Sequence, residues 1–181
     1  MRVHRHGGFT LTRGFTLIEV LVALFVLAVG VVGAGAAQLA AQRTRQQSAL
    51  MSEAAQQAAS LGARMRANAA AAGLPDSSNP YLSLDYDAAD GNPGAAPASC
   101  YGASACDPLQ LAAFDLHEAK QGVYAAFPGG RIAVCRDAAP WDAGTRRYRW
   151  ACTAGAGAPM LIKLGWSGTG AAPGLVAVAP L

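Results

Sequence analysis

The N-terminal part of the sequence has no proline and very little charge. The first proline is Pro75, and charged residues make up 14% of the whole chain, against a usual share of about 25%. No proline therefore interrupts a helix within the first 74 residues. The shortage of charge is expected if part of the chain lies in lipid.

Large apolar side chains are also scarce outside that region. Hydrophobic residues make up 52% of the chain, but 42 of them are alanine. Residues 42–181 contain only 31 Val, Ile, Leu, Met, Phe, Trp or Tyr in 140 positions. The length allows one compact domain with an attachment, and so thin a core is expected to need covalent support.

The net charge of +3 comes from the first 14 residues, which contain Arg2, Arg5 and Arg13 and no acidic residue. The remaining 11 basic residues are balanced by 11 acidic ones. The basic isoelectric point is therefore due to a targeting segment and not to a basic surface. Nucleic acid is not an expected partner.

A long apolar run extends from Phe15 to Ala41 with Glu19 as its one charge. As a helix, 27 residues are roughly 40 Å long, which exceeds the approximately 30 Å of the hydrocarbon layer. The run can span a membrane. A removable export signal, cut near Ala34–Ala37, is the alternative.

The orientation of this span follows from the cysteines more than from the arginines. Three leader arginines precede the span, while Arg43 and Arg45 follow it, so the positive-inside count is close to a tie. An even number of cysteines after the span favours disulfides in an oxidising compartment. We therefore expect the N-terminus in the cytoplasm.

Glu19 is the unusual residue of the run. A charged group near the bilayer centre costs about 2.5 to 3.5 kcal/mol on insertion scales, so the carboxylate is expected to have a partner. The alternative is that Glu19 lies close enough to the cytoplasmic face to reach water.

The segment from Arg13 to Leu24, RGFTLIEVLVAL, resembles the class III leader and processing site of type IV pilins and pseudopilins. The resemblance implies that a prepilin peptidase cuts between Gly14 and Phe15 and that the new Phe15 amine is methylated. It also implies that Glu19 pairs with the N-terminal amine of a neighbouring subunit, a use of buried ion pairs that fixes register. The earlier GFTL at Gly8 imitates the site but lacks the apolar residue and glutamate that should follow.

One departure from the family concerns the proline that major pilins often carry inside this helix. Ala36 stands where we expect it. Three nearby glycines, Gly30, Gly33 and Gly35, either supply flexibility instead or permit close helix packing, and both readings stay open.

An amphipathic pattern continues the run. Its apolar positions at helical spacing are Leu39, Leu50, Ala54, Ala58, Leu61 and Met65. One helix from Phe15 to Ala72, with its outer half packed on a sheet, is the economical prediction, and a free coiled coil is the less favoured alternative.

Residues 73–106 form a turn-rich stretch. Its aspartates lack the spacing of a calcium loop and predict a solvated loop instead. Asp107, Pro108 and Gln110 then predict the start of a helix. The residues expected to face inward from this helix are Leu109, Ala112, Ala113 and Leu116, and the helix is expected to end at 128–130.

Four strands are predicted after that turn, as an antiparallel sheet: Arg131–Arg136, Arg147–Thr153, Met160–Trp166 and Gly174–Ala179. The basic and aromatic segment 146–150 has the composition of a nucleic-acid stripe. In a strand, however, its arginines should face water and its aromatics the helix, so a structural role is preferred.

The cysteines allow three connectivities, of which proximity along the chain favours Cys100 with Cys106 and Cys135 with Cys152. Zinc is disfavoured, because there is no Cys-x-x-Cys pair and His117 is the one histidine outside the leader. We expect no metal and no cofactor.

Further segments are similar to minor pilins of the type IV pilus modification (PilV) type. They are the end of the helix at 65–68, the short cysteine loop before a capped helix, and the FPGG turn at 127–130 leading into 134–137. The resemblance implies an α+β fold in which a long N-terminal helix packs on a small antiparallel sheet with a short extra helix.

The expected organisation is a leader at 1–14, a membrane and assembly segment at 15–41, an amphipathic half-helix at 42–72 and a disulfide-stapled head at 73–181. The resemblance implies a non-catalytic pilus subunit of the inner membrane. Its implied partners are the prepilin peptidase, other major and minor pilins, the assembly platform and, before assembly, the lipid bilayer.

Three alternatives belong to other classes. A type II secretion pseudopilin shares the leader and fold, and a DNA- or ligand-binding pilin would bind through its head. An exported hydrolase is disfavoured, because the residues 165–169 do not have the spacing of a nucleophile elbow.

Overall fold

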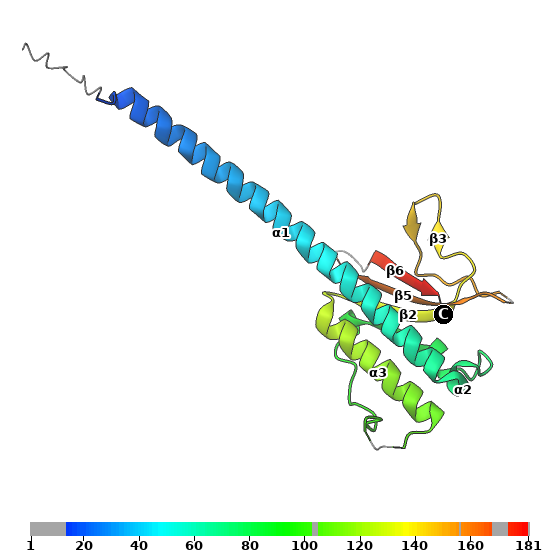
Figure 1. The fold of residues 1–181 in the computed structure, drawn as a ribbon. Coiled ribbons are helices and arrows are strands. Elements are labelled where there is room, and N and C mark those ends of the chain that lie inside the picture. The colour runs from blue at the N-terminus through cyan, green and yellow to red at the C-terminus, as the bar shows by residue number, and fades with distance from the viewer. Residues whose placement is uncertain (1–13, 103–104, 156, 168–173, 181) are drawn as a thin grey trace, which may run out of the picture. The chain divides into compact units, whose positions relative to one another are not determined.

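The computed structural model describes residues 14–102, 105–155, 157–167 and 174–180 (Figure 1). The predicted leader therefore lies, apart from Gly14, outside the described residues. The described helices and strands are, in order, α1 Leu17–Ala67, α2 Ala69–Ala72, η1 Pro80–Ser83, β1 Asp85–Asp87, η2 Ala88–Asp90, α3 Pro108–Ala126, β2 Arg131–Arg136, β3 Trp141–Asp142, β4 Arg147–Tyr148, β5 Met160–Trp166 and β6 Gly174–Pro180. The chain divides into two compact units at Arg45 and Gln46.

Helix α1 is continuous for 51 residues and passes through Gly30, Gly33 and Gly35 without a break. It ends five residues before the predicted end at Ala72. The backbone of Asn68 is not helical, with φ −100° and ψ 54°. Helix α2 is a separate turn of four alanines. The Asn68 side chain instead donates hydrogen bonds to the Pro108 carbonyl and to Tyr81 Oη.

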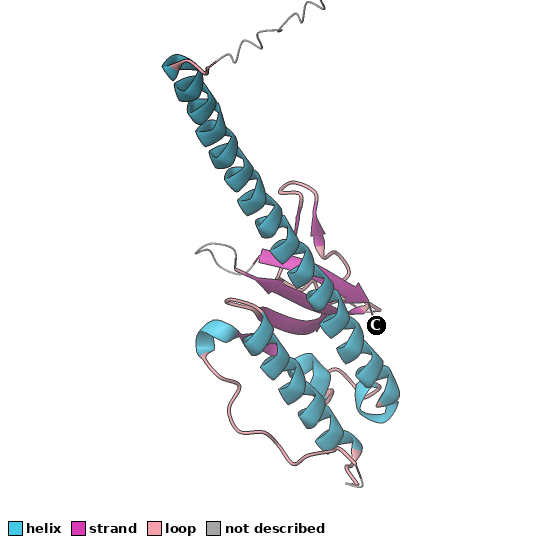
Figure 2. Cartoon of the chain, turned by 60° about the vertical axis from the view of Figure 1, so that its left-hand side comes forward, coloured by secondary structure: helices cyan, strands magenta, loops and turns pink. Residues whose placement is uncertain are grey.

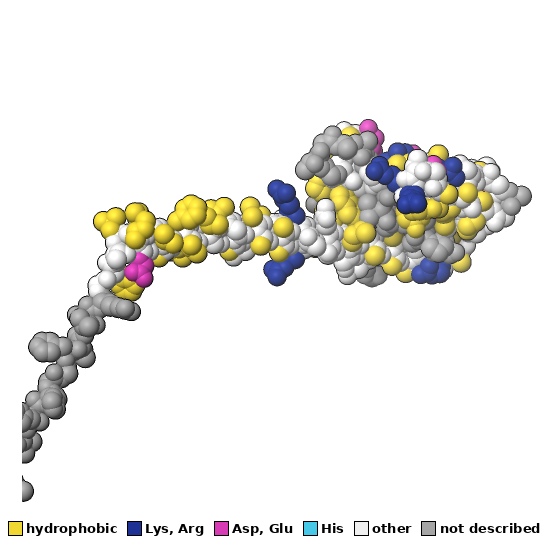
Figure 3. Space-filling view, turned by 90° about the horizontal axis from the view of Figure 1, so that it is seen from above, with side chains coloured by type: hydrophobic (Ala, Val, Ile, Leu, Met, Phe, Trp, Pro, Cys, Tyr) yellow, Lys and Arg dark blue, Asp and Glu magenta, His cyan; other side chains and the backbone are white. Residues whose placement is uncertain are grey.

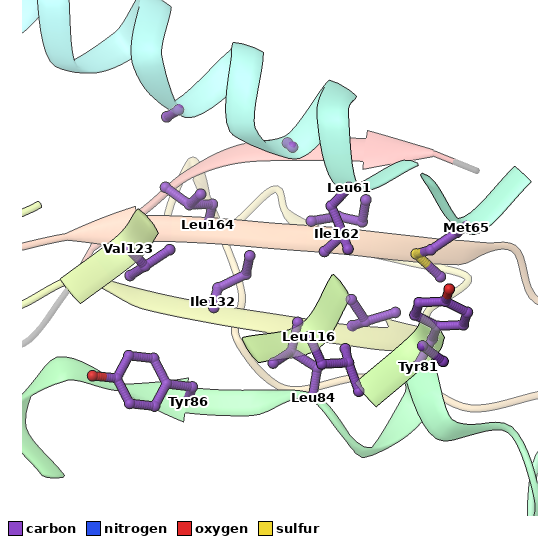
Figure 4. Close-up of a cluster of buried hydrophobic side chains, with 14 of the residues drawn as sticks. Leu61, Met65, Tyr81, Leu84, Tyr86, Leu116, Val123, Ile132, Ile162 and Leu164 are labelled. Atoms are coloured by element: carbon purple, nitrogen blue, oxygen red, sulfur yellow. The ribbon is translucent and has the colours of Figure 1, made fainter. Parts of the chain in front are cut away.

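The main sheet has the order β1-β2-β5-β6, and every neighbouring pair is antiparallel. Alternate residues of β2 and β5 enter one apolar cluster with the outer part of α1 and with α3 (Figure 4). The members of this core are Ala54, Ala58, Leu61, Met65, Ala71, Tyr81, Leu84, Tyr86, Ala112, Leu116, Val123, Phe127, Ile132, Val134, Ile162 and Leu164. The expectation that the outer half of the helix packs on a sheet is confirmed, and the fold is an α+β, pilin-like layout (Figure 2).

Strand β1 was missed by sequence reasoning, because it is only three residues long and lies among turn-forming aspartates. It pairs with β2, and Asp85 receives two hydrogen bonds from the Arg131 guanidinium at 3.0 and 3.1 Å. Asp87 caps η2 by accepting from the Ala89 amide at 2.9 Å. Two aspartates of the predicted loop thus have structural roles.

The start of α3 is confirmed in detail. Asp107 Oδ1 accepts from the Leu109 and Gln110 amides at 2.9 and 2.8 Å, and the Gln110 side chain accepts from the Asp107 amide, which is a capping box. Ala112 and Leu116 are buried, as predicted for the inward face. The prediction is wrong for Leu109, which is 56% exposed, and for Ala113, which is also exposed. Phe114 and Asp115 are buried beside them, so the buried face lies further round the helix.

The predicted strand Arg147–Thr153 is wrong. Only Arg147–Tyr148 forms a strand, and it pairs with β3 in a separate two-stranded sheet. Trp141 and Tyr148 stack edge to face on this hairpin, 49% and 40% exposed, so they do not face the helix. The alternating arginine and aromatic residues lie instead in a long connection between β2 and β5. We call residues 137–153 of this connection the excursion.

Candidate functional site

The predicted processing site directly precedes the first turn of α1. Gly14 and Phe15 are exposed and non-helical, and Phe15 is 82% exposed. The Thr16 carbonyl accepts from the Glu19 and Val20 amides at 3.1 and 3.2 Å, and Thr16 Oγ1 also accepts from the Glu19 amide at 3.3 Å. Thr16 therefore caps the helix, and the Gly14–Phe15 bond lies just outside it in exposed, non-helical chain.

Glu19 lies in the first turn of α1, where the helix dipole favours a carboxylate. Glu19 is one of the residues that line a shallow groove, and the others are all apolar: Phe15, Val20, Ala23, Leu24 and Leu27. The ion pairs within the described part of the chain do not include Glu19.

The apolar part of α1 is almost wholly exposed. Its large side chains from Phe15 to Val32 keep between about half and four fifths of their surface, and the segment satisfies the length and composition of a membrane span. So much exposed apolar surface requires lipid or other apolar helices around it.

In the head, Lys163 anchors the excursion 137–153. Its ammonium donates to Asp137 Oδ2 at 2.5 Å and to the carbonyls of Arg149, Trp150 and Ala151 at 2.9, 3.4 and 3.0 Å. Both charged side chains are fully buried. The buried cation therefore organises a loop that has little regular structure of its own.

Asp137 is held by several donors. Burial raises its pKa, but the hydrogen bond from Lys163 and those from the Thr153 hydroxyl and the Ala139 and Thr153 amides outweigh burial, so its pKa is lowered. The carboxylate is ionised at any physiological pH.

A second buried network joins α1 to α3. Asn68 Nδ2 donates to Tyr81 Oη at 3.0 Å, Tyr81 Oη donates to Asp115 Oδ2 at 2.9 Å, and Arg64 donates to Asp115 Oδ1 at 3.3 Å. Burial, together with the bond to Asp115, raises the pKa of Tyr81 against the opposing bond from Asn68. The network fixes the end of α1 against the start of the head.

Two disulfides join Cys100 to Cys106 and Cys135 to Cys152, the pairing that chain proximity favours. The second joins Cys135, near the end of β2, to Cys152, near the end of the excursion. Within the described residues, no three His, Cys, Asp or Glu side chains come together as a metal site.

These features define a pilin-like layout: a long helix with an exposed apolar half, and an α+β head that includes its other half. Residues 11–35 match the family model described as the prokaryotic N-terminal methylation motif. The matched segment contains Gly14, Phe15 and Glu19, and it supports the pilin family and implies a type IV pilin or pseudopilin. No curated protein and no solved structure matches the chain.

Sequence reasoning missed the buried polar groups of the head. Lys163 is the clearest case, because it is a lone charge between Ile162 and Leu164 in an otherwise apolar strand. A charged residue there predicts a buried partner, as Glu19 did in the helix. Asp137 could then have been proposed as that partner.

Proposed function

We propose that the chain is a minor type IV prepilin, a non-catalytic subunit that supports pilus assembly, adhesion or twitching motility. The single observation that carries this proposal is the N-terminal methylation motif at 11–35, which ends in an exposed apolar helix. In the head, the fully buried charges of Lys163 and Asp137 are paired with each other and hydrogen-bonded to backbone groups, which is a structural use of charge.

Processing is proposed between Gly14 and Phe15, with methylation of the Phe15 amine. The exposed, non-helical backbone at this bond supports the proposal, because a peptide bond inside a hydrogen-bonded helix is a poor protease substrate. Cleavage would also remove Arg2, Arg5 and Arg13, the charges that hold the leader on the cytoplasmic side.

Glu19 is proposed to pair with the Phe15 amine of a neighbouring subunit during assembly. Support comes from its position in the lining of an exposed apolar groove, where a second apolar helix can pack and bring a cation to the carboxylate. An ion pair buried between apolar helices contributes register more than stability, since desolvation offsets its attraction.

The minor pilin of the PilV type is proposed from the head. Two of the segments that resemble this type are in contact: Asn68 donates to the Pro108 carbonyl at 2.8 Å, next to the capped start of α3. Phe127 of the FPGG turn is buried and stacks on Trp166, with ring centroids 5.2 Å apart.

The proposed location is the inner membrane, as a single span with a cytoplasmic N-terminus and a periplasmic head, and then the pilus on the cell surface. The two disulfides support an oxidising compartment for the head. The proposed partners are the prepilin peptidase, other pilins and the assembly platform.

The test is the intact mass of the protein purified from membranes after coexpression with a prepilin peptidase. The expected mass lacks residues 1–14 and includes one added methyl group. The Gly14→Ala variant should remain uncut and have the mass of the full chain. The Gly8→Ala variant, changed at the imitation site, should be processed normally. An uncut wild-type chain, or normal processing of Gly14→Ala, would contradict the proposal.

Fractionation of cells then separates a pilus subunit from a secretion pseudopilin. The proposed minor pilin should appear in sheared surface filaments, and its deletion should reduce piliation or twitching. Loss of protein secretion with normal pili would assign the chain to a type II secretion system instead.

A further inference from the structure

Two arginines mark the end of the apolar part of α1. Arg43 and Arg45 are both exposed, and they are the first charges after Glu19. At about 100° per residue they point to nearly opposite sides of the helix. Figure 3 shows Lys and Arg side chains on both sides of the helix where its apolar part ends. We call Arg43 and Arg45 the arginine belt.

Neither arginine of the belt has a carboxylate partner on its own helix. The positions three and four residues away carry only Ala, Leu, Gln and Ser, and the next acid along the chain is Glu53. Within the described residues, the arginines that form ion pairs are Arg64, Arg131 and Arg136. The belt is therefore a pair of cations in need of anions outside the described chain.

The belt lies at a defined distance from Glu19. The 24 residues from Glu19 to Arg43 correspond to about 36 Å along a continuous helix. A bilayer has a hydrocarbon layer of about 30 Å and a total thickness of about 40–45 Å with its headgroups. When the belt lies among the headgroups of one leaflet, Glu19 reaches the headgroup region of the other.

We propose that the arginine belt binds the phosphate groups of membrane lipids in the leaflet opposite Glu19. Guanidinium groups bind phosphate oxygens through paired hydrogen bonds, and long arginine side chains at the end of a span extend readily to the interface. Because the two side chains leave the helix on opposite sides, phosphates all around the helix can be bound. The unassembled subunit is thus held at one depth.

This depth has a consequence for Glu19. The carboxylate lies at the polar boundary while the subunit is stored in the membrane, so it needs no partner there. Only when the helix moves toward the periplasmic side does the acid enter the apolar layer, and a neighbouring cation is then required. The inference depends on membrane insertion of 15–41 and not on incorporation into a pilus.

The test measures contact between arginine carbon and lipid phosphorus by solid-state NMR dephasing. The full chain is prepared with labelled arginine in vesicles of phosphatidylethanolamine and phosphatidylglycerol in equal amounts. Arg2, Arg5 and Arg13 are replaced by glutamine in every sample, so that nine arginines remain. We expect dephasing of the arginine Cζ signal that is largely lost in the double variant Arg43→Gln with Arg45→Gln.

The matched control is Arg146→Gln with Arg147→Gln, two exposed arginines of the head, which should keep the dephasing. Replacement of the belt by lysine should keep contact with the lipid phosphate, measured at the labelled lysine. Absence of dephasing in the parent, or equal dephasing without the belt, overturns the proposal. If the parent shows none and the belt variant is poorly incorporated into pili, the arginines pair with a protein carboxylate instead.

Discussion

Lys163 Nζ lies 2.5 Å from Asp137 Oδ2, and the same ammonium donates to three successive backbone carbonyls of the excursion 137–153. One buried side chain therefore holds a segment that has only a two-residue hairpin ladder of its own. The stability of this part of the head depends on a charge, because the supply of large apolar residues is small.

Breaking this pair should be costly. Asp137→Asn leaves the ammonium of Lys163 buried without its anion, and we expect a loss of about 3–5 kcal/mol in the free energy of unfolding. Replacing both residues, with Lys163→Met and Asp137→Asn, should cost less than the sum of the two single changes. Denaturant titration of the full chain in detergent micelles measures the coupling, and strict additivity would contradict it.

The long disulfide should contribute more than the short one. Cys135 and Cys152 are 17 residues apart and Cys100 and Cys106 are 6 apart, so the chain-entropy relation gives about 3 and about 2 kcal/mol. Paired Cys→Ser variants of each bridge, compared by denaturant unfolding, measure both values. The larger loss is expected for the 135–152 pair, and the reverse order would show that native contacts outweigh loop closure.

Tyr81 predicts a loss of stability at alkaline pH. Its pKa is raised in the folded state, so its contribution is complete below the unfolded pKa of about 10. As the pH rises above that value, the unfolded chain loses the phenolic proton while the folded chain keeps it, and folding weakens. Tyr81→Phe should be less stable at neutral pH and show a smaller decline above about pH 10, as followed by circular dichroism.

The cap of α3 offers a smaller and more local test. Asp107→Ala removes the acceptor of the Leu109 and Gln110 amides and should cost about 1 kcal/mol. Asp107→Asn keeps an acceptor oxygen and should recover most of that loss. Hydrogen exchange at the first turn of α3 provides the readout, and equal exchange in the two variants would refute the assignment.

Glu19 and Glu53 provide a matched pair on one helix. Glu19→Ala should be processed normally but should be several-fold less abundant in sheared pili, because it removes the carboxylate of the proposed ion pair with the neighbouring subunit. Glu53→Ala removes an exposed acid from the outer half of α1 and should have little effect. Quantitative immunoblots of membranes and filaments check both, and normal incorporation of Glu19→Ala would exclude the proposed pairing.

The helix and the main strands could be predicted because their apolar residues repeat with a clear period. Positions 54, 58, 61 and 65 are buried as the spacing predicted, and β2 and β5 have the predicted bounds. The cap of α3 was readable from Asp107 and Gln110, since capping depends on residues close together in the chain.

What could not be predicted depends on contacts between distant residues. The helix stops at Asn68 because that side chain bonds to Tyr81 and Pro108, 13 and 40 residues away. The segment after Arg147 does not join the main sheet. Its carbonyls at residues 149–151 instead accept hydrogen bonds from the Lys163 ammonium. Local alternation of residue types contains no information about either partner.

The two ends of the excursion are held together by the 135–152 disulfide and by the contacts of Asp137 with Thr153 and Lys163. Its tip, residues 143–146, is exposed. Such an arrangement separates what holds the segment from what it displays. A short foreign peptide grafted between Gly144 and Thr145 would be carried on a scaffold that does not need the original tip, which makes this turn the natural place to introduce an epitope or a capture tag.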